Sequence, residues 1–208
     1  GDGMEKVFYS LGVTAIVPGG QSMNPSTGEL LEAVESVSQT KVILLPNNKN
    51  IIPSAVQVQD LTNKELIVVP TETMPQGVAA LLSFDYDADL ASNATNMKET
   101  VSNVRTAEVT KAVRTTNIGG LTIEQGQVIA FIDGHLSSFG DSPDEVLCQA
   151  LIVSGLKGSE LVTIYYGNDT ELANAEQVGN WIRQQYPDLS VELVYGGQPY
   201  YHYIASIE

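Results

Sequence analysis

Short apolar runs alternate with helical stretches along the first part of the chain, and this alternation constrains the fold more than any other feature. The apolar runs are Thr14 to Val17, Lys41 to Leu45 and Glu65 to Val69, and a turn cluster and a helix start follow each of them. Such βαβ patterns are typical of a parallel sheet whose strands are connected by helices. The sequence therefore predicts a parallel α/β lobe over residues 1–86.

Helix starts in this lobe carry recognisable capping signals. Ser26 and Glu29 have the spacing of a capping box, in which the serine side chain and the glutamate side chain each satisfy a free backbone amide. Thr73 and Gln76 repeat this spacing, with a proline in the first turn where it is tolerated. For the helix that runs through Val56, we expect the cap to be Asn47 or Asn48.

The pattern changes after a polar helical stretch at residues 87–104, which we interpret as a connecting helix. Apolar runs at 128–132 and 136–139 flank Asp133 and Gly134, a pair that favours a tight hairpin between antiparallel strands. Ser142 is expected to cap the next helix. A strand is then expected at 161–165, a helix at 169–185 that buries Leu172, Val178 and Ile182, and two strands at 191–195 and 201–207. Residues 105–208 are thus predicted to form an α+β lobe with antiparallel strands, which makes the whole chain a two-lobed α/β protein.

The charge balance excludes several classes of partner. With 25 acidic and 10 basic residues, the net charge of −15 repels nucleic acids and anionic membrane surfaces. This charge either keeps the protein soluble or prefers a basic face on another protein, and the sequence leaves both interpretations open. The candidate acidic contributors to such a contact are Asp85, Asp87, Asp89, Asp141, Asp144 and Glu145.

The cellular setting follows from what the sequence lacks. Its apolar stretches are far shorter than the roughly 20 residues of a membrane span, so no span is expected. The single cysteine, Cys148, excludes a disulfide framework and is expected to be buried in a helix as a small hydrophobe. Cytoplasmic localisation is therefore the expectation.

Polar residues gather in the three loops that follow the predicted parallel strands. Ligands meet the carboxyl ends of such strands, where helix N-termini can also hold an anion. We expect a ligand or partner cleft there, with part of the last strand pair nearby, although turns and caps need the same residue types. The candidate residues are Ser22, Asn24, Ser26, Asn47, Asn48, Lys49, Thr73, Gln76, Gly196, Gly197, Gln198 and His202.

No catalytic constellation is recognisable in the sequence. The serines lie outside any Gly-x-Ser-x-Gly elbow, and no Gly-x-x-x-x-Gly-Lys-Ser/Thr phosphate loop is present. His135 is expected to be exposed after the hairpin turn, and His202 to be a packed or partly exposed edge residue. Two histidines and one cysteine far apart in sequence suggest no metal site. We therefore expect no catalytic residue, metal or cofactor in this chain.

Several long polar strings resemble one known family. They are Ser10 to Val13, Val17 to Thr27, Ile43 to Ile51, Val69 to Gly77, Thr106 to Thr110, Leu161 to Gly167 and Val194 to Tyr200. In this order they resemble the C-terminal region of the bacterial fatty acid kinase large subunit, FakA, which is related to dihydroxyacetone kinases. The resemblance implies a fold like that of DegV proteins and of the fatty-acid-carrying subunit FakB, with the loop of Asn24 and Ser26 where such proteins hold a carboxylate. The string from Gly196 to His202 departs from the lipid-binding pattern.

The resemblance implies a function in fatty acid phosphorylation. This chain would be the partner-docking region that binds FakB, while ATP and magnesium would bind an N-terminal domain of the same polypeptide. The abrupt start at Gly1, a turn directly followed by a helical pattern, also leads us to expect that the polypeptide continues upstream. The alternative is a DegV-like module that itself binds a fatty acid or another small carboxylate, and a free-standing hydrolase is a third hypothesis without a visible nucleophile and base.

Overall fold

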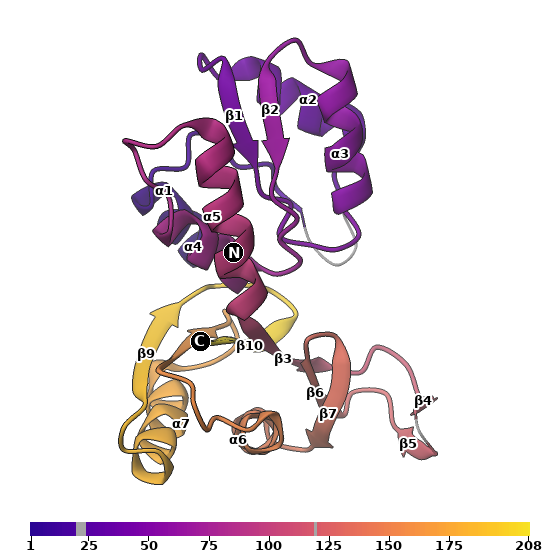
Figure 1. Cartoon of the computed structure of the whole chain (residues 1–208). Coiled ribbons are helices and arrows are strands. Elements are labelled where there is room, and N and C mark those ends of the chain that lie inside the picture. Colours follow the sequence, from indigo (N-terminus) through magenta and orange to yellow (C-terminus); the bar gives the residue numbers. More distant parts are fainter. Residues whose placement is uncertain (20–23, 119) are drawn as a thin grey trace. The chain divides into compact units, whose positions relative to one another are not determined.

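The chain forms two compact units (Figure 1). The computed structural model describes residues 1–19, 24–118 and 120–208. The N-terminal unit comprises Val7–Val104, and the C-terminal unit combines Gly1–Lys6 with Arg105–Glu208. Helix α1 (Asp2–Ser10) spans the division between them. Parallel and antiparallel strands are both present, so the predicted mixed α/β class is confirmed.

The N-terminal unit is a two-stranded parallel sheet with helices on both faces. Lys41 of β1 lies opposite Glu65 of β2. Side chains alternate along each strand, so Leu66 and Val68 pack with helices α2 and α3, whereas Ile67 packs with α4 and α5. The elements are α2 (Thr27–Ser36), β1 (Lys41–Leu44), α3 (Ile52–Leu61), β2 (Glu65–Val68), α4 (Met74–Leu82) and α5 (Leu90–Asn103). The residues predicted as a connecting helix thus form α5, which packs in this core through Met97.

Two predictions for this unit are wrong. In the part of the chain that the structure describes, residues 14–17 form no strand, and Val17 instead packs against the cluster around Leu30. A short apolar run needs a neighbouring strand to become a strand itself, and here Val17 is only partly buried by packing. Neither Asn47 nor Asn48 caps α3, because the residue before that helix is Ile51, which makes no side-chain capping bond.

The C-terminal unit contains a six-stranded mixed sheet in the order β7-β6-β3-β10-β8-β9. Strands β8 and β9 pair in parallel, and the other neighbours pair antiparallel. Its strands are β3 (Arg105–Lys111), β6 (Val128–Ile132), β7 (His135–Gly140), β8 (Leu161–Tyr166), β9 (Ser190–Tyr195) and β10 (Tyr201–Ile207). A separate hairpin of β4 (Thr116–Ile118) and β5 (Leu121–Ile123) extends from it.

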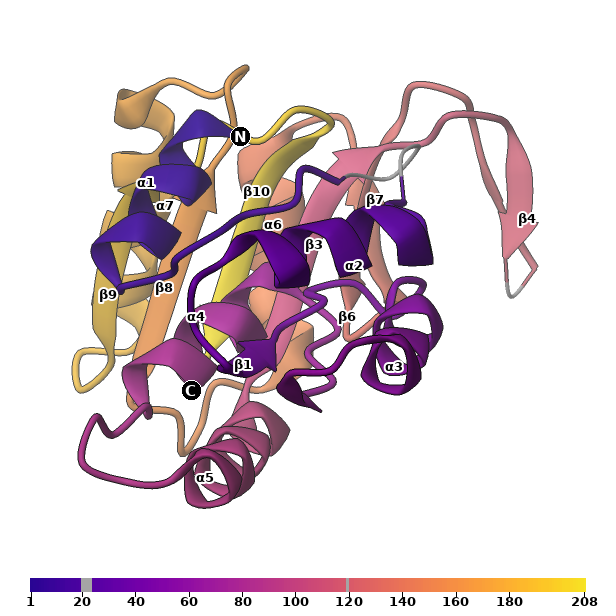
Figure 2. The ribbon, with the colours of Figure 1, turned by 90° about the horizontal axis from the view of Figure 1, so that it is seen from above.

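Helices α6 (Pro143–Ser154) and α7 (Leu172–Gln185) lie on the same face of this sheet (Figure 2). Leu147 and Leu151 of α6 and Ile182 of α7 are fully buried in one cluster with the strand side chains. The opposite side of β6 is covered by a smaller cluster that includes Ile123 and Ile129. Strand β10, which is central, is buried from His202 to Ile207.

Predictions for this unit that depend only on neighbouring residues, a hairpin turn and a helix cap, are confirmed. Asp133 and Gly134 both have positive φ, 49° and 77°, and they connect the antiparallel strands β6 and β7 as predicted. Ser142 caps α6 by accepting a bond from the Glu145 amide. Leu172, however, was predicted to be buried and is half-exposed, because it is the first residue of α7 and the sheet-facing positions begin at Ala175.

Candidate functional site

Two of the three polar loops of the N-terminal unit meet at the carboxyl ends of its paired strands. The Asn47 backbone amide, just after β1, donates to the Thr71 hydroxyl after β2 at 2.9 Å. That hydroxyl in turn donates to Asn47 Oδ1 at 2.8 Å. Adjacent parallel strands place their following loops side by side, which explains the contact. Sequence reasoning did not single out Thr71, although it lies in the same polar run as Thr73 and is fully buried.

The N-terminus of helix α4 packs closely on this pair. A Cβ on Gly77 would lie 2.8 Å from Asn47 Cγ and 2.9 Å from its Nδ2, so only glycine fits beside the amide. Asn47 itself adopts a left-handed φ of 54°, which asparagine tolerates better than most residues. Asn47, Thr71 and Gly77 therefore form one tightly packed polar corner.

The free amides at the helix starts are largely satisfied by the chain itself. Thr73 accepts from the Gln76 amide, and Gln76 Oε1 accepts from the Glu72 amide at 2.7 Å. At α2 the predicted capping box is present, with the Ser26 amide donating to Glu29 at 2.8 Å, and this bond lowers the pKa of the exposed Glu29 carboxyl. These caps leave fewer amides for an anion than the sequence suggested.

The other predicted residues of this unit are less constrained. Asn24 and Lys49 are exposed, and Asn48 Oδ1 accepts from the Asn50 amide at 2.9 Å. Ser22 lies outside the described residues. The structure therefore brings Asn47 together with the α4 start, and it shows no bond from Asn24 or Lys49 to that corner among the residues described.

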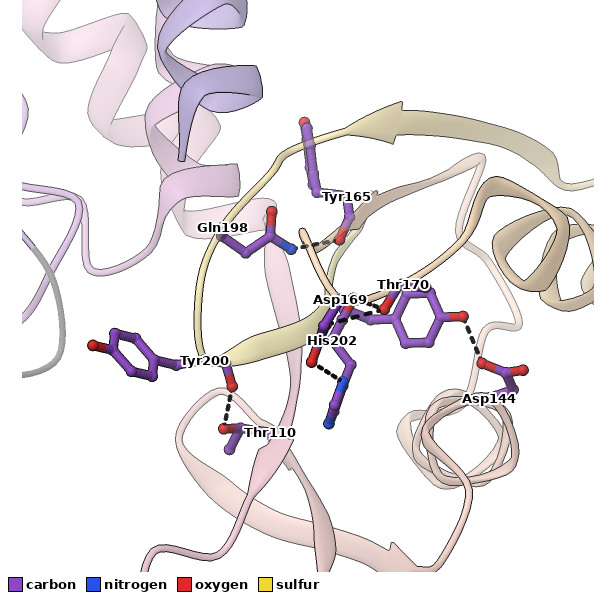
Figure 3. Close-up of polar contacts among 9 residues, drawn as sticks. Thr110, Asp144, Tyr165, Asp169, Thr170, Gln198, Tyr200 and His202 are labelled. Carbon is purple, nitrogen blue, oxygen red and sulfur yellow. Dashed lines mark hydrogen bonds and ion pairs between the residues drawn. The ribbon is translucent and has the colours of Figure 1, made fainter.

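In the C-terminal unit, the loop between β9 and β10 is held by backbone bonds. The amides of Gly196 and Gly197 donate to the Tyr166 carbonyl at 3.0 and 3.2 Å, and the Met4 amide donates to the Gly196 carbonyl at 2.9 Å. The buried Gln198 side chain donates to the Tyr165 carbonyl at 2.9 Å (Figure 3). Its Oε1 is buried and has no hydrogen-bond partner among the described residues.

His202 is a buried residue of a central strand, not the edge residue that was one expectation. Its side chain is 8% exposed, and Nδ1 lies 2.8 Å from Asp169 Oδ2 (Figure 3). Its Nε2 is also buried, and within the part of the chain that the structure describes it has no hydrogen-bond partner.

A second polar link joins β10 to the two helices. The Tyr203 hydroxyl donates to Asp144 Oδ1 at 2.6 Å, and Asn174 Nδ2 donates to Asp144 Oδ2 at 3.0 Å. Burial and the bond to Asp144 raise the pKa of the Tyr203 phenol. Burial and the nearby carboxylates of Asp144 and Glu145 raise the pKa of the half-buried Cys148 thiol to about 11. This thiol is therefore a weak nucleophile at neutral pH.

Asn24, Asn48, Thr73 and Gln76 belong to one unit and Gly196 to Gln198 to the other. Their union in a single cleft stays a prediction. Across the described ranges, no group of three or more His, Cys, Asp or Glu side chains could hold a metal ion. No helix in those ranges has both the length and the apolar character that crossing a membrane requires.

The fold is that of the DegV class. A DegV family protein from Corynebacterium glutamicum matches 98% of this chain and 91% of its own, with a TM-score of 0.66 at 15% identity. The Streptococcus pneumoniae fatty acid kinase B3 protein, loaded with linoleic acid, matches with a TM-score of 0.63 at 11% identity, over 99% and 83% of the two chains. Dihydroxyacetone kinase from C. freundii matches 89% of this chain and 42% of its own, with a TM-score of 0.56 at 14% identity.

Sequence comparison identifies the family within this class. The model of the FakA-like C-terminal family of fatty acid kinases matches residues 1–208, and the chain belongs to that family. An uncharacterized protein of Staphylococcus aureus strain USA300 is 38% identical over all 208 residues, which are 38% of its own length. One from the bovine strain RF122 is 37% identical over the same shares. The chain thus spans less than half the length of these curated relatives.

Proposed function

We propose that this chain is the partner-docking region of an ATP-dependent fatty acid kinase. In this proposal it binds a FakB-type subunit that carries the fatty acid, and the ATP domain elsewhere in the polypeptide phosphorylates the fatty acid carboxyl group. The observation that supports it is the family match over the whole chain. The relatives have ample further length in which an ATP domain can lie.

Catalysis and the cofactors are assigned to the rest of the polypeptide. Phosphoryl transfer depends on a phosphate cradle and usually Mg²⁺, and the sequence of this chain lacks the glycine-rich lysine loop that builds one such cradle. We therefore predict that the isolated chain neither binds nor hydrolyses ATP. Isothermal titration calorimetry with ATP and Mg²⁺ tests this, and micromolar binding would refute it.

The docking proposal has an electrostatic component. Because the net charge is −15, we expect a basic face on the partner. Surface charges mainly set the association rate, so this rate should fall as salt rises from about 50 to about 500 mM, while dissociation changes less. Surface plasmon resonance with the lipid-loaded FakB-type subunit measures both rates. Absence of binding at every salt concentration refutes docking, whereas salt-independent binding refutes only the electrostatic component.

The alternative is a DegV-like module that itself binds a fatty acid. The likeness to a structure loaded with linoleic acid favours it. Two features argue against it: the α4 start is capped by its own side chains, and Lys49 is exposed. Native mass spectrometry of the purified chain distinguishes the two, because a retained acyl ligand supports the module and an empty chain supports docking.

A further inference from the structure

Helix α6 is bordered by an open hollow on each side. The hollow on the side of α7 is lined by Cys148, Val178 and Trp181. The hollow on the side of β7 is lined by Phe139 and Val153 among others. Both hollows are lined by Gln149 and Ile152, so they flank the same stretch of α6, and we call the two together the α6 groove.

The α6 groove exposes apolar side chains that the core does not use. Leu147 and Leu151 already bury the sheet-facing side of α6 completely. Ile152 and Val153 nevertheless are 52% and 66% exposed, although a helix that only covers a sheet carries polar residues on its outer side. Half-buried Trp181 of α7 adds an aromatic surface of the kind enriched at protein interfaces. Exposed aliphatic and aromatic side chains gathered beside one helix suit a contact with another protein.

One end of the groove is acidic. Asp144 and Glu145 lie in the first turn of α6 and line the hollow beside α7. The bonds from Tyr203 and Asn174 fix the Asp144 carboxylate in place, and the Asn174 bond brings the first turn of α7 beside that of α6. Among the described residues that line either hollow, none is Lys or Arg. A complementary partner therefore needs an apolar segment with Lys or Arg at one end.

We infer that the α6 groove is the surface on which the FakB-type subunit docks, through an apolar segment of that subunit flanked at one end by Lys or Arg. This inference rests on the proposed function, because it names the surface which that function uses. Apolar contact with Ile152 and Trp181 supplies the attraction at close range. The Asp144 and Glu145 carboxylates set the orientation and the rate of association.

Substitutions at exposed positions test the inference without disturbing the core. Ile152→Glu places a charge in the apolar part of the groove and should weaken binding of the lipid-loaded FakB-type subunit by about tenfold or more. Glu145→Lys should mainly slow association. Leu61→Glu is the matched control, because Leu61 is 58% exposed on α3 and lies outside the groove. Circular dichroism establishes that each variant is folded before its affinity is measured.

The single cysteine provides an independent readout. Cys148 lies in the groove and is the only thiol in the chain, so its labelling by a maleimide reports on this surface alone. Because the raised pKa of this thiol makes the reaction slow, the labelling is followed at mildly alkaline pH. Saturating FakB-type subunit should slow the labelling of wild-type chain further. Its effect on a Cys148→Ala, Leu61→Cys variant, labelled outside the groove, should be negligible.

The outcomes separate the groove from the docking function. If Ile152→Glu binds the FakB-type subunit as well as the wild-type chain does, and the subunit does not slow labelling of Cys148 in the wild-type chain, the groove is not the docking surface. The docking function itself then stands. If Leu61→Glu weakens binding and Ile152→Glu does not, the surface lies elsewhere. The inference is also overturned if Ile152→Glu abolishes a dimer of this chain without changing the affinity for the FakB-type subunit, because the groove would then pair two copies of the chain. If the wild-type chain does not bind, both proposals fail.

Discussion

Replacing Gly77 by alanine tests the polar corner at the ends of β1 and β2. The new methyl group would lie 2.8 Å from Asn47 Cγ, well inside an ordinary contact, so the Asn47 side chain has to move. This movement breaks the 2.8 Å bond in which Thr71 donates to Asn47 Oδ1. Thr71 is fully buried, so its hydroxyl proton then has no water to replace the lost acceptor.

The expected magnitude is the difference between two opposing effects. Loss of the buried bond costs about 1–3 kcal/mol, and the better helix propensity of alanine returns about 1 kcal/mol. The net loss of unfolding free energy is then about 1 kcal/mol, which lowers the melting temperature by roughly 2–4 °C for a chain of this length. Urea unfolding and differential scanning calorimetry measure the two quantities.

A matched glycine elsewhere isolates the bond. Gly28 also lies in the first turn of a helix, α2, but a Cβ there would meet only Ser26 Oγ, at 3.8 Å, among the residues that the structure describes. Gly28→Ala should therefore stabilise the protein by up to about 1 kcal/mol. Asn47→Gly combined with Gly77→Ala should remove the clash, since glycine accepts the left-handed φ of 54°. Equal stabilisation by Gly28→Ala and Gly77→Ala would contradict the proposed strain between Gly77 and Asn47.

Two further predictions concern α6, one its bond to β10 and one its cysteine. Tyr203→Phe removes the hydrogen bond to Asp144 and should lower the unfolding free energy by about 1.5 kcal/mol, the lower end for a charged acceptor because Asp144 is only half-buried. In the same urea titration, Tyr200→Phe at an exposed position should cost almost nothing. Because the folded-state pKa of the Cys148 thiol is raised to about 11, its contribution to stability is complete below the ordinary value of about 8.5 and is lost as pH rises toward 11. The urea midpoint should therefore fall more between about pH 7.5 and about pH 10 for wild type than for Cys148→Ala, and equal falls would contradict the assignment.

Features that depend on a few neighbouring residues could be predicted from the sequence. The Ser26 capping box and the Ser142 cap form because donor and acceptor are fixed by a spacing of three residues in the first turn of a helix. The hairpin at Asp133 and Gly134 forms because two residues of positive φ are needed between twisted strands. The periodicity predicted the α/β class, whereas the DegV-like fold and the family came only from the resemblance to the FakA C-terminal region.

Features that depend on distant partners were decided only by the tertiary structure. The segment at residues 14–17 has strand composition but no strand beside it among the described residues, so Val17 is only partly buried, against the cluster around Leu30. Asn47 has the chemistry of a helix cap, yet its side-chain oxygen accepts a hydrogen bond from Thr71, 24 residues away, because β1 and β2 pair in parallel. His202 is surrounded by tyrosines in the sequence and was expected to be a packed or partly exposed edge residue. Strand β10 is central in the sheet, however, and His202 is buried there beside Asp169. The α6 groove likewise exists only because α6 packs between α7 and β7, since Ile152 follows Leu151 in the sequence with nothing to tell the exposed side chain from the buried one.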